Sequence, residues 1–319
     1  MGYGHIGQKH ASILQQMENC RLLALADIRP ITDLALPVPL YRGLDEMLKE
    51  AREIEVVSIA TPNGLHEAHA IRCLRAGKHV VVEKPMALNL ASCERMTLEA
   101  ERAGRELFCV LQNRYSPAIQ WLKNQIEKAA LGKVFMVQVN CFWNRDERYY
   151  KQGSWHGTRA LDGGTLFTQF SHFIDILYFL FGDITNIQSK LAYENHVPGL
   201  EIEDAGMIMF DFVNGGLGNL NFTTAAWNHN IESSITILAE QGTVKISGQY
   251  MNQLHVSAID NISGVPHLQN AGSDNHRPFF QQVADQLLGK KPPAPENRDG
   301  KKVVEIIERI YQSAGIGTA

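Results

Sequence analysis

The sequence lacks both a broad excess of positive charge and any apolar run long enough to span a membrane. Its 319 residues include 30 Lys and Arg against 34 Asp and Glu, which gives a formal net charge of -4. Nucleic-acid backbones are bound by basic surfaces, so we expect no nucleic-acid partner. A transmembrane helix needs about 20 apolar residues in a row, so we expect no membrane span. The first residues show neither a basic leader nor an apolar signal core, and we expect a cytoplasmic protein.

Cysteine is also scarce. The 5 cysteines are odd in number and scattered over apolar segments. Their spacing fits neither a disulfide framework nor a zinc site, so we expect buried free thiols.

Length and pattern together indicate two domains. A chain of 319 residues is too long for one comfortable core and long enough for two. In its first third, short apolar runs alternate with helical patterns, which is typical of a doubly wound parallel sheet. The expected strands are 22–26, 56–60, 79–82 and 107–111, and the expected helices are 6–17, 65–76 and 89–103.

The pattern changes after residue 113. Ser116-Pro117 begins a helix, which Gly132 ends before a strand at 134–143. From residue 184 onward, short strands are joined by tight turns such as Asn214-Gly215, which indicates antiparallel pairing. A proline-rich connector at 290–300 leads to a last helix at 301–313. We therefore predict an α/β domain at 1–113 and an α+β domain with a mostly antiparallel open sheet at 114–319.

A glycine fingerprint, Gly2-x-Gly4-x-x-Gly7, opens the first expected helix. Backbone N–H groups at such a helix start can face a pyrophosphate, and Asp27 ends the next strand about 20 residues on, where it can accept hydrogen bonds from ribose hydroxyls. A carboxylate there repels a 2'-phosphate, which favours NAD over NADP, although Arg29 is close by.

A Rossmann fingerprint normally follows a strand, yet only Met1 precedes Gly2. The central strand of the parallel sheet is thus absent from this sequence. We expect the natural chain to extend upstream by a short apolar stretch; the alternative is a compromised nucleotide site.

Lys84 lies in Glu83-Lys84-Pro85, directly after the expected strand 79–82. In an open parallel sheet, ligands settle outside the carboxyl ends of the strands, so Lys84 can reach a substrate lying on the cofactor. Thr61-Pro62-Asn63 follows the strand 56–60 at the same edge. This loop is either a cofactor contact or an ordinary turn.

His66 and His69 lie three residues apart on the helix after that loop. The spacing is one residue short of the HExxH zinc pattern and no third ligand is suggested. We therefore expect no metal, and a solvated helix face or a cofactor contact by His66.

The expected helix 165–181 is apolar nearly all round but carries a narrow polar stripe that includes His172 and Asp175. Such a stripe on a buried helix indicates a cavity wall. An imidazole titrates near neutral pH, which suits His172 for proton exchange; the alternative is a structural histidine paired with Asp175.

These stretches together resemble the glucose-fructose oxidoreductase, inositol dehydrogenase and rhizopine-catabolism (Gfo/Idh/MocA) family of two-domain dehydrogenases. The resemblance spans the chain and rests on GYGHIGQKH, TPNGLHEAHA, GKHVVVEKPMAL, QNRYSPA and DGGTLFTQFSHFID, in the family's order and spacing. It implies an NAD-binding Rossmann domain at 1–113 and a domain for substrate binding and oligomerisation at 114–319.

Within the family, the stretch from Tyr149 to Asp183 and the later EIEDAG look most like bacterial UDP-N-acetyl-2-amino-2-deoxyglucuronate 3-dehydrogenases of surface-polysaccharide synthesis. The resemblance implies a UDP-sugar acid as substrate. Two positions differ from these relatives: His156 stands where they usually carry arginine, and Thr168 where they carry asparagine.

The expected chemistry is oxidation of a secondary alcohol, with His172 as general base and Lys84 as the cation that stabilises developing alkoxide; the two roles could be exchanged. The residues expected to contact the cofactor are Gly2, Gly4, His5, Ile6, Gly7, Asp27, Thr61, Asn63, His66, Glu83, Lys84, Gln112 and Trp155. Those expected to contact the substrate are Lys84, Arg114, Tyr149, Tyr150, Trp155, Thr158, Thr168, Gln169 and His172.

Two alternatives stay open: a dehydrogenase of a free polyol or sugar such as an inositol, and a regulator that senses NAD without turnover. In either case, an antiparallel sheet with one uncovered face would hide apolar surface against another subunit. We expect a homodimer or homotetramer.

Overall fold

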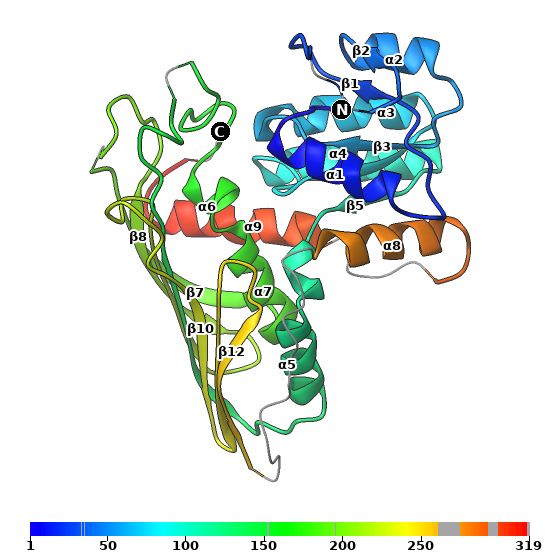
Figure 1. Ribbon diagram of the computed structural model, residues 1–319. Coiled ribbons are helices and arrows are strands. Elements are labelled where there is room, and N and C mark those ends of the chain that lie inside the picture. The colour runs from blue at the N-terminus through cyan, green and yellow to red at the C-terminus, as the bar shows by residue number, and fades with distance from the viewer. Residues whose placement is uncertain are drawn as a thin grey trace. The chain divides into compact units, whose positions relative to one another are not determined.

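The computed structural model describes residues 1–32, 34, 36–151, 153–194, 196–260, 275–292 and 299–317, which form two compact units (Figure 1). The first unit combines Met1–Val110 with His276–Val304, and the second combines Leu111–Asn275 with Glu305–Ala319. The predicted division at 113/114 differs in two respects: the first unit breaks at Val110, and the prediction left residues 276–304 in the second domain. They belong to the first unit because the helix that begins at His276 packs there, with the Phe280 ring 4.8 Å from the His10 ring.

The first unit has parallel strands. Strand β1 pairs with β2, and β3, β4 and β5 form a separate three-stranded sheet. Met1 and Gly2 form backbone hydrogen bonds to the ends of both β1 and β3. The Gly2 N–H donates to the Ala26 carbonyl, and the Ala60 N–H donates to the Met1 carbonyl, each over 2.8 Å. The strands are β1 Leu25–Ala26, β2 Leu40–Tyr41, β3 Val56–Ile59, β4 His79–Val82 and β5 Leu107–Cys109.

The helices of the first unit carry recognisable start and stop signals. In α4, the Asn89 side chain accepts the Ser92 N–H over 2.8 Å, and Gly104 ends the helix in the left-handed region at φ 60°. The elements are α1 His5–Gln15, α2 Leu44–Glu50, the 3-10 turn η1 Asn63–Leu65, α3 His66–Arg75, α4 Leu90–Ala103 and α8 His276–Leu287.

The second unit is built on a seven-stranded sheet in the order β12-β11-β10-β6-β9-β8-β7. All neighbours are antiparallel except β6 and β9, which run parallel. Its strands are β6 Val134–Phe142, β7 Ile184–Ala192, β8 Ala205–Phe212, β9 Leu217–Thr223, β10 Glu232–Ala239, β11 Gly242–Ser247 and β12 Gln253–Ile259. Its helical segments are η2 Gln112–Tyr115, α5 Pro117–Glu127, α6 Thr165–Thr168 and α7 Ser171–Phe181.

Helices cover one face of this sheet. Helix α9 (Asp299–Ser313) begins in the first unit and ends in the second, and its Ile306 and Ile310 join Ile174 and Leu177 of α7 against the sheet (Figure 1). Strand β8 alternates accordingly, with Ile208, Phe210 and Phe212 buried and Met207 and Met209 exposed.

The fold class predicted from the sequence is confirmed: a Rossmann unit and an α/β unit with a mostly antiparallel sheet. The expected single helix at 165–181 is instead two helices, α6 and α7, with Gln169 and Phe170 between them. Of the predicted connector 290–300, residues 293–298 lie outside the described part of the chain. Within the described residues, no helix has the length and apolar content needed to cross a membrane.

Candidate functional site

The glycine loop of the first unit makes backbone contacts that a side chain would block. Gly2 has φ +83°, and a Cβ on it would lie 2.5 Å from the Ala60 carbonyl oxygen. A Cβ on Gly7 would lie 1.9 Å from the Gly2 carbonyl oxygen. Helix α1 begins at His5 directly after Gly4, and the first turn of any helix leaves N–H groups without helical partners. The loop therefore offers the cradle that a pyrophosphate requires.

Asp27 ties this loop to the end of β1. One carboxylate oxygen accepts the Tyr3 N–H over 2.7 Å, and the other accepts the Arg29 N–H over 2.8 Å. The Arg29 guanidinium adds bonds of 3.0 and 2.9 Å. Burial alone would raise the pKa of Asp27, but the bonds from Arg29 and Tyr3 outweigh it and hold the pKa at about 2. Asp27 therefore stays negatively charged at the position predicted to read the ribose.

His66 lies between two loops of the first unit, and its side chain has no exposed surface. Its ring nitrogens face backbone carbonyls, Nδ1 that of Pro85 at 2.8 Å and Nε2 that of Thr61 at 3.0 Å. The ring thus joins the loop after β3 to the segment after β4. Because the ring is fully buried between these two carbonyls, the arrangement favours a positioning role for His66 over the predicted cofactor contact.

The neighbouring loop residues differ in exposure. Thr61 is half-buried, and its Oγ1 lies 3.0 Å from Nδ1 of His69, whose pKa burial lowers to about 4. Asn63 is 5% exposed. Lys84 is half-buried, whereas the Glu83 side chain before it is buried and bonded to His10. This internal bond favours a positioning role for Glu83 over the predicted cofactor contact.

In the second unit, Gln112 and His172 meet. The amide nitrogen of Gln112 lies 3.3 Å from Nε2 of His172 at the start of α7. Gln112 is 5% exposed and His172 is half-buried. The two groups are within hydrogen-bonding distance, and the contact orients the imidazole. Gln112, predicted as a cofactor contact, thus directly contacts the predicted general base.

Arg114 points into the protein rather than outward. It is 3% exposed, and its Nε and Nη2 both donate to Asp175 Oδ1, over 2.9 and 2.5 Å. The guanidinium carbon also lies 4.7 Å from the centre of the Phe179 ring. The guanidinium is held by groups of α7, so the structure favours a structural role over the predicted substrate contact.

Tyr149 and Gln169 form a second polar group together with Arg145. The Gln169 amide donates to Tyr149 Oη over 2.6 Å, and Arg145 Nε donates to Gln169 Oε1 over 3.0 Å. The Arg145 guanidinium lies over the rings of Trp143 and Tyr149, at 4.7 and 5.2 Å. Sequence reasoning missed Arg145, because its side-chain partner lies 24 residues further along the chain.

Tyr150 differs from its neighbour. It is 7% exposed and packs with Val197 and Ile202 in a small apolar cluster. The ring contributes to the core of this region, so the structure favours packing over the predicted substrate contact.

The segment after Tyr150 stacks aromatic rings. Trp155 and His156 lie 3.9 Å apart with 26° between their planes, and the His156 ring is 4.5 Å from that of Tyr149. Burial lowers the pKa of His156 to about 4, so this ring is neutral near pH 7. Thr158 Oγ1 donates to the Trp155 carbonyl over 2.8 Å and so holds the turn.

Thr168 bonds to the buried carboxyl group of Asp162. Asp162 also accepts the Gly157 N–H over 2.8 Å, and burial raises its pKa to about 6. Sequence reasoning missed Asp162. The Thr168 hydroxyl, which was predicted to contact the substrate, thus already donates a hydrogen bond to the carboxyl group of Asp162.

Comparison with known proteins agrees with this architecture. The chain matches the oxidoreductase family with an NAD-binding Rossmann fold over residues 1–110 and that family's C-terminal alpha/beta domain over residues 123–318. It is similar to the WlbA dehydrogenase of Bordetella pertussis, solved with NADH and UDP-GlcNAcA, at 32% identity and a TM-score of 0.90 over 98% of this chain and 94% of that one.

Two curated relatives are also similar. Myo-inositol 2-dehydrogenase of Thermotoga maritima is 24% identical over 94% of this chain and 91% of that protein. The 1-carboxy-3-chloro-3,4-dihydroxycyclohexa-1,5-diene dehydrogenase of Comamonas testosteroni is 31% identical over 64% of this chain, and the match spans about half, 51%, of that relative's length.

The glycine cradle and the ionised Asp27 fit NAD, and the cofactor predicted from the sequence is confirmed by the family match. The chain belongs to the Gfo/Idh/MocA family of NAD-binding oxidoreductases.

Proposed function

We propose that this protein is an NAD-dependent dehydrogenase that oxidises a secondary alcohol of a sugar, the 3-hydroxyl of a UDP-N-acetylglucosaminuronate-type nucleotide sugar. The observation that carries the proposal is the likeness, over nearly the whole chain, to a dehydrogenase solved with NADH and UDP-GlcNAcA. The presence of both Lys84 and His172 supports turnover rather than cofactor sensing alone.

The chain's own residues have two tasks in such a reaction. Bound NAD supplies the acceptor for the hydride, so the protein must remove the hydroxyl proton and balance the charge that develops on oxygen. We assign His172 as general base. The Gln112 amide, 3.3 Å from its Nε2, would orient the ring.

We assign Lys84 as the cation that stabilises the developing alkoxide. It follows β4 at the carboxyl edge of the parallel sheet, where ligands of this fold class settle. An ammonium there lowers the free energy of the alkoxide more than that of the neutral alcohol, which is the condition for accelerating the reaction.

Substrate binding is proposed for the polar group Arg145, Tyr149 and Gln169 and for the stacked Trp155. Because Arg114 is bonded internally to Asp175, Arg145 replaces it in this proposal as the cation for an acidic substrate. Burial lowers the pKa of Arg145, but an arginine remains protonated at pH 7.

Turnover tests the substrate directly. Purified protein with NAD is mixed with UDP-GlcNAcA or with myo-inositol, and NADH absorbance is followed. We expect a higher kcat/KM with UDP-GlcNAcA. A preference for myo-inositol would favour the alternative that the relative from Thermotoga maritima supports. NAD binding without turnover of any sugar would favour a regulator.

The proposal includes a cytoplasmic role in surface-polysaccharide synthesis and a homo-oligomer. The sheet face opposite α7 carries apolar side chains in register, since Met136 of β6 pairs with Leu217 of β9 and Leu238 of β10. Met207 and Met209 of β8 are 69% and 59% exposed. A second copy would cover this face. Mass by light scattering should give a dimer or tetramer, and Met207→Lys should shift it toward the monomer.

A further inference from the structure

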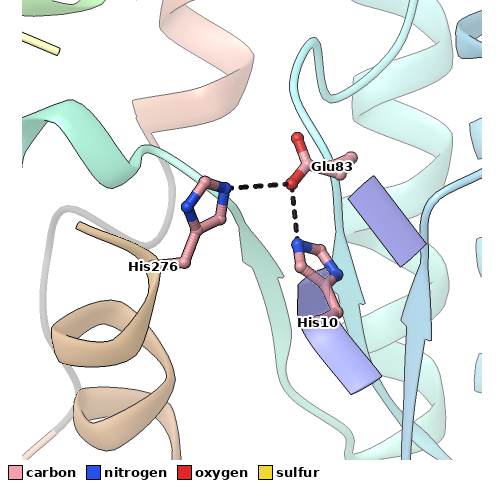
Figure 2. A group of neighbouring side chains, drawn as sticks. All are labelled: His10, Glu83 and His276. Carbon is pink, nitrogen blue, oxygen red and sulfur yellow. Dashed lines mark hydrogen bonds and ion pairs between the residues drawn. The ribbon is translucent and has the colours of Figure 1, made fainter. Parts of the chain in front are cut away.

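A buried group of two histidines and one glutamate lies next to Lys84. His10 comes from α1, Glu83 follows β4, and His276 begins α8, and their side chains point toward one another (Figure 2). The three are 2%, 6% and 2% exposed, and their nearest ligand-type atoms all lie within 4.8 Å. All three residues belong to the first unit.

Glu83 receives hydrogen bonds on both oxygens. Its Oε1 lies 2.9 Å from His10 Nε2 and 3.8 Å from His276 Nε2 (Figure 2). Its Oε2 accepts the backbone N–H of Lys84 over 3.0 Å. Since a carboxylate only accepts, His10 must donate from Nε2, and its Nδ1 then faces Ser58 Oγ at 2.9 Å. Burial alone would raise the pKa of Glu83, but His10, His276 and Lys84 hold it at about 2.

The distances distinguish a hydrogen-bonded group from a metal centre. Ligand atoms about 2.0–2.1 Å from a tetrahedral zinc ion lie about 3.3 Å from one another. The 2.9 Å between His10 Nε2 and Glu83 Oε1 is shorter than this and is ordinary for a charge-assisted hydrogen bond. Oε2 is also occupied by the Lys84 N–H. The geometry is that of a hydrogen-bond network around the ionised carboxylate of Glu83.

We propose that Glu83, held ionised by His10 and His276, is a positioning residue that fixes the backbone of Lys84 and keeps its ammonium charged. The inference rests on the proposed catalytic role of Lys84. The carboxylate acts in two ways: it accepts the Lys84 backbone N–H, and its negative charge interacts with the charge of Lys84.

The other side of Lys84 is held as well. The Pro85 carbonyl lies 2.8 Å from His66 Nδ1, so both neighbours of Lys84 are bonded to buried histidines. The charged or titratable groups that interact with Glu83 are His10, His276, Lys84 and His66. The three histidines come from α1, α8 and α3 and are buried, whereas Lys84 is half-buried.

Glu83→Gln removes the charge but keeps the shape. The pKa of Lys84 is measured by reductive ¹³C-methylation of the lysines and NMR titration, with its signal identified by its loss in Lys84→Arg. We expect this pKa to fall by about one unit or more in Glu83→Gln, because the neighbouring negative charge is gone. Glu83→Asp, which keeps the charge, should stay close to the wild type. An unchanged Lys84 pKa in Glu83→Gln overturns the inference.

Kinetics give the second readout. Glu83→Gln should lower kcat at least tenfold with NADH affinity kept within a few-fold, and should move the limb of the pH–rate profile that belongs to Lys84 to lower pH. If Lys84→Ala keeps full turnover, the proposed function fails, whereas the NMR titration still decides the role of Glu83. His10→Leu, which removes the donor to Glu83, is the second variant if Glu83→Gln does not fold; wild-type kcat together with an unchanged Lys84 pKa in it would refute the network.

A matched control comes from the second unit, where His196 Nδ1 lies 2.8 Å from the buried Asp204. Asp204→Asn removes a carboxylate from a similar pair and should lower stability without shifting the Lys84 pKa.

Metal content is measured in parallel. Stoichiometric zinc that is lost in His10→Leu, together with loss of NADH affinity on chelation, would replace the hydrogen-bond network with a metal site.

Discussion

Breaking the pair of Arg114 and Asp175 should destabilise the second unit severely. Asp175 has no exposed surface and Arg114 is 3% exposed, with N–O distances of 2.9 and 2.5 Å between them. Removing one partner of such a pair leaves the other charge buried, at a cost of about 3–5 kcal/mol. In a unit of this size, this corresponds to a fall in Tm of roughly 6–20 °C. We expect Asp175→Asn to lie in this range.

The double variant Arg114→Met/Asp175→Leu should recover most of that loss. Replacing both charges by apolar groups of similar volume leaves neither one buried without a partner, and such replacements are often neutral. The rescue should exceed what the single variants predict additively, because the two residues are in contact.

Thermal unfolding followed by circular dichroism measures this effect, and steady-state kinetics separate it from substrate binding. Asp175 lies one turn after His172 on α7, so Asp175→Asn should also lower kcat. If Arg114→Met kept its Tm within about 1 °C of wild type while KM for the sugar rose many-fold, Arg114 would be a substrate contact and our reasoning would be refuted.

Three further changes test the site. Lys84→Ala and His172→Ala should each lower turnover roughly 100-fold or more while NAD affinity stays within a few-fold, as measured by absorbance and calorimetry; near-normal kcat in either variant removes its assigned role. Asp27→Ala should weaken NAD binding and narrow the preference over NADP, and an unchanged ratio in calorimetric titrations would show that Asp27 does not read the ribose. The pKa of Asp162 is raised by burial from 3.8 to about 6, so the folded state binds more protons there than the unfolded state and stability falls as pH rises through that window. Asp162→Asn should flatten this part of the curve of Tm against pH, and a curve identical to that of wild type would contradict it.

Periodicity and local turn signals predicted the elements that depend on nearby residues. The alternation of apolar residues at Ile208, Phe210 and Phe212 can be recognised in the sequence, because one face of β8 is buried. The return of α8 to the first unit was not predicted. That packing depends on the contact of Phe280 with His10, 270 positions earlier in the chain, and no local pattern records such a partner.

The position at which α6 begins has a similar cause. Thr165 Oγ1 donates to Glu203 Oε1 over 2.7 Å, and the Leu166 N–H donates to the same oxygen over 3.2 Å. The start of α6 is thus fixed by a carboxylate 38 residues away. Helical periodicity through Phe170 continues unbroken, so the pattern alone predicts one helix.

Residue type was a weaker guide to role than to position. Arg114, Tyr150 and His66 carry groups that can bind ligands, and each was predicted to do so. Arg114 and Tyr150 have partners from distant parts of the sequence, Asp175 and the apolar cluster around Val197, and His66 faces the Pro85 carbonyl 19 residues away. A polar side chain that is buried must be satisfied inside the protein, and only the fold shows whether it is.

The motifs of the first unit hold one another in place. His10 belongs to the stretch GYGHIGQKH and bonds to Glu83 of GKHVVVEKPMAL, and His66 of TPNGLHEAHA faces the carbonyl of Pro85 in that same stretch. Several of their polar residues therefore serve the contacts between motifs. The half-buried Lys84 lies between two residues that these histidines fix. Glu83 and Pro85, on either side of Lys84, thus contact residues for which no substrate contact is expected, so variants at Glu83 and at Lys84 should have different effects.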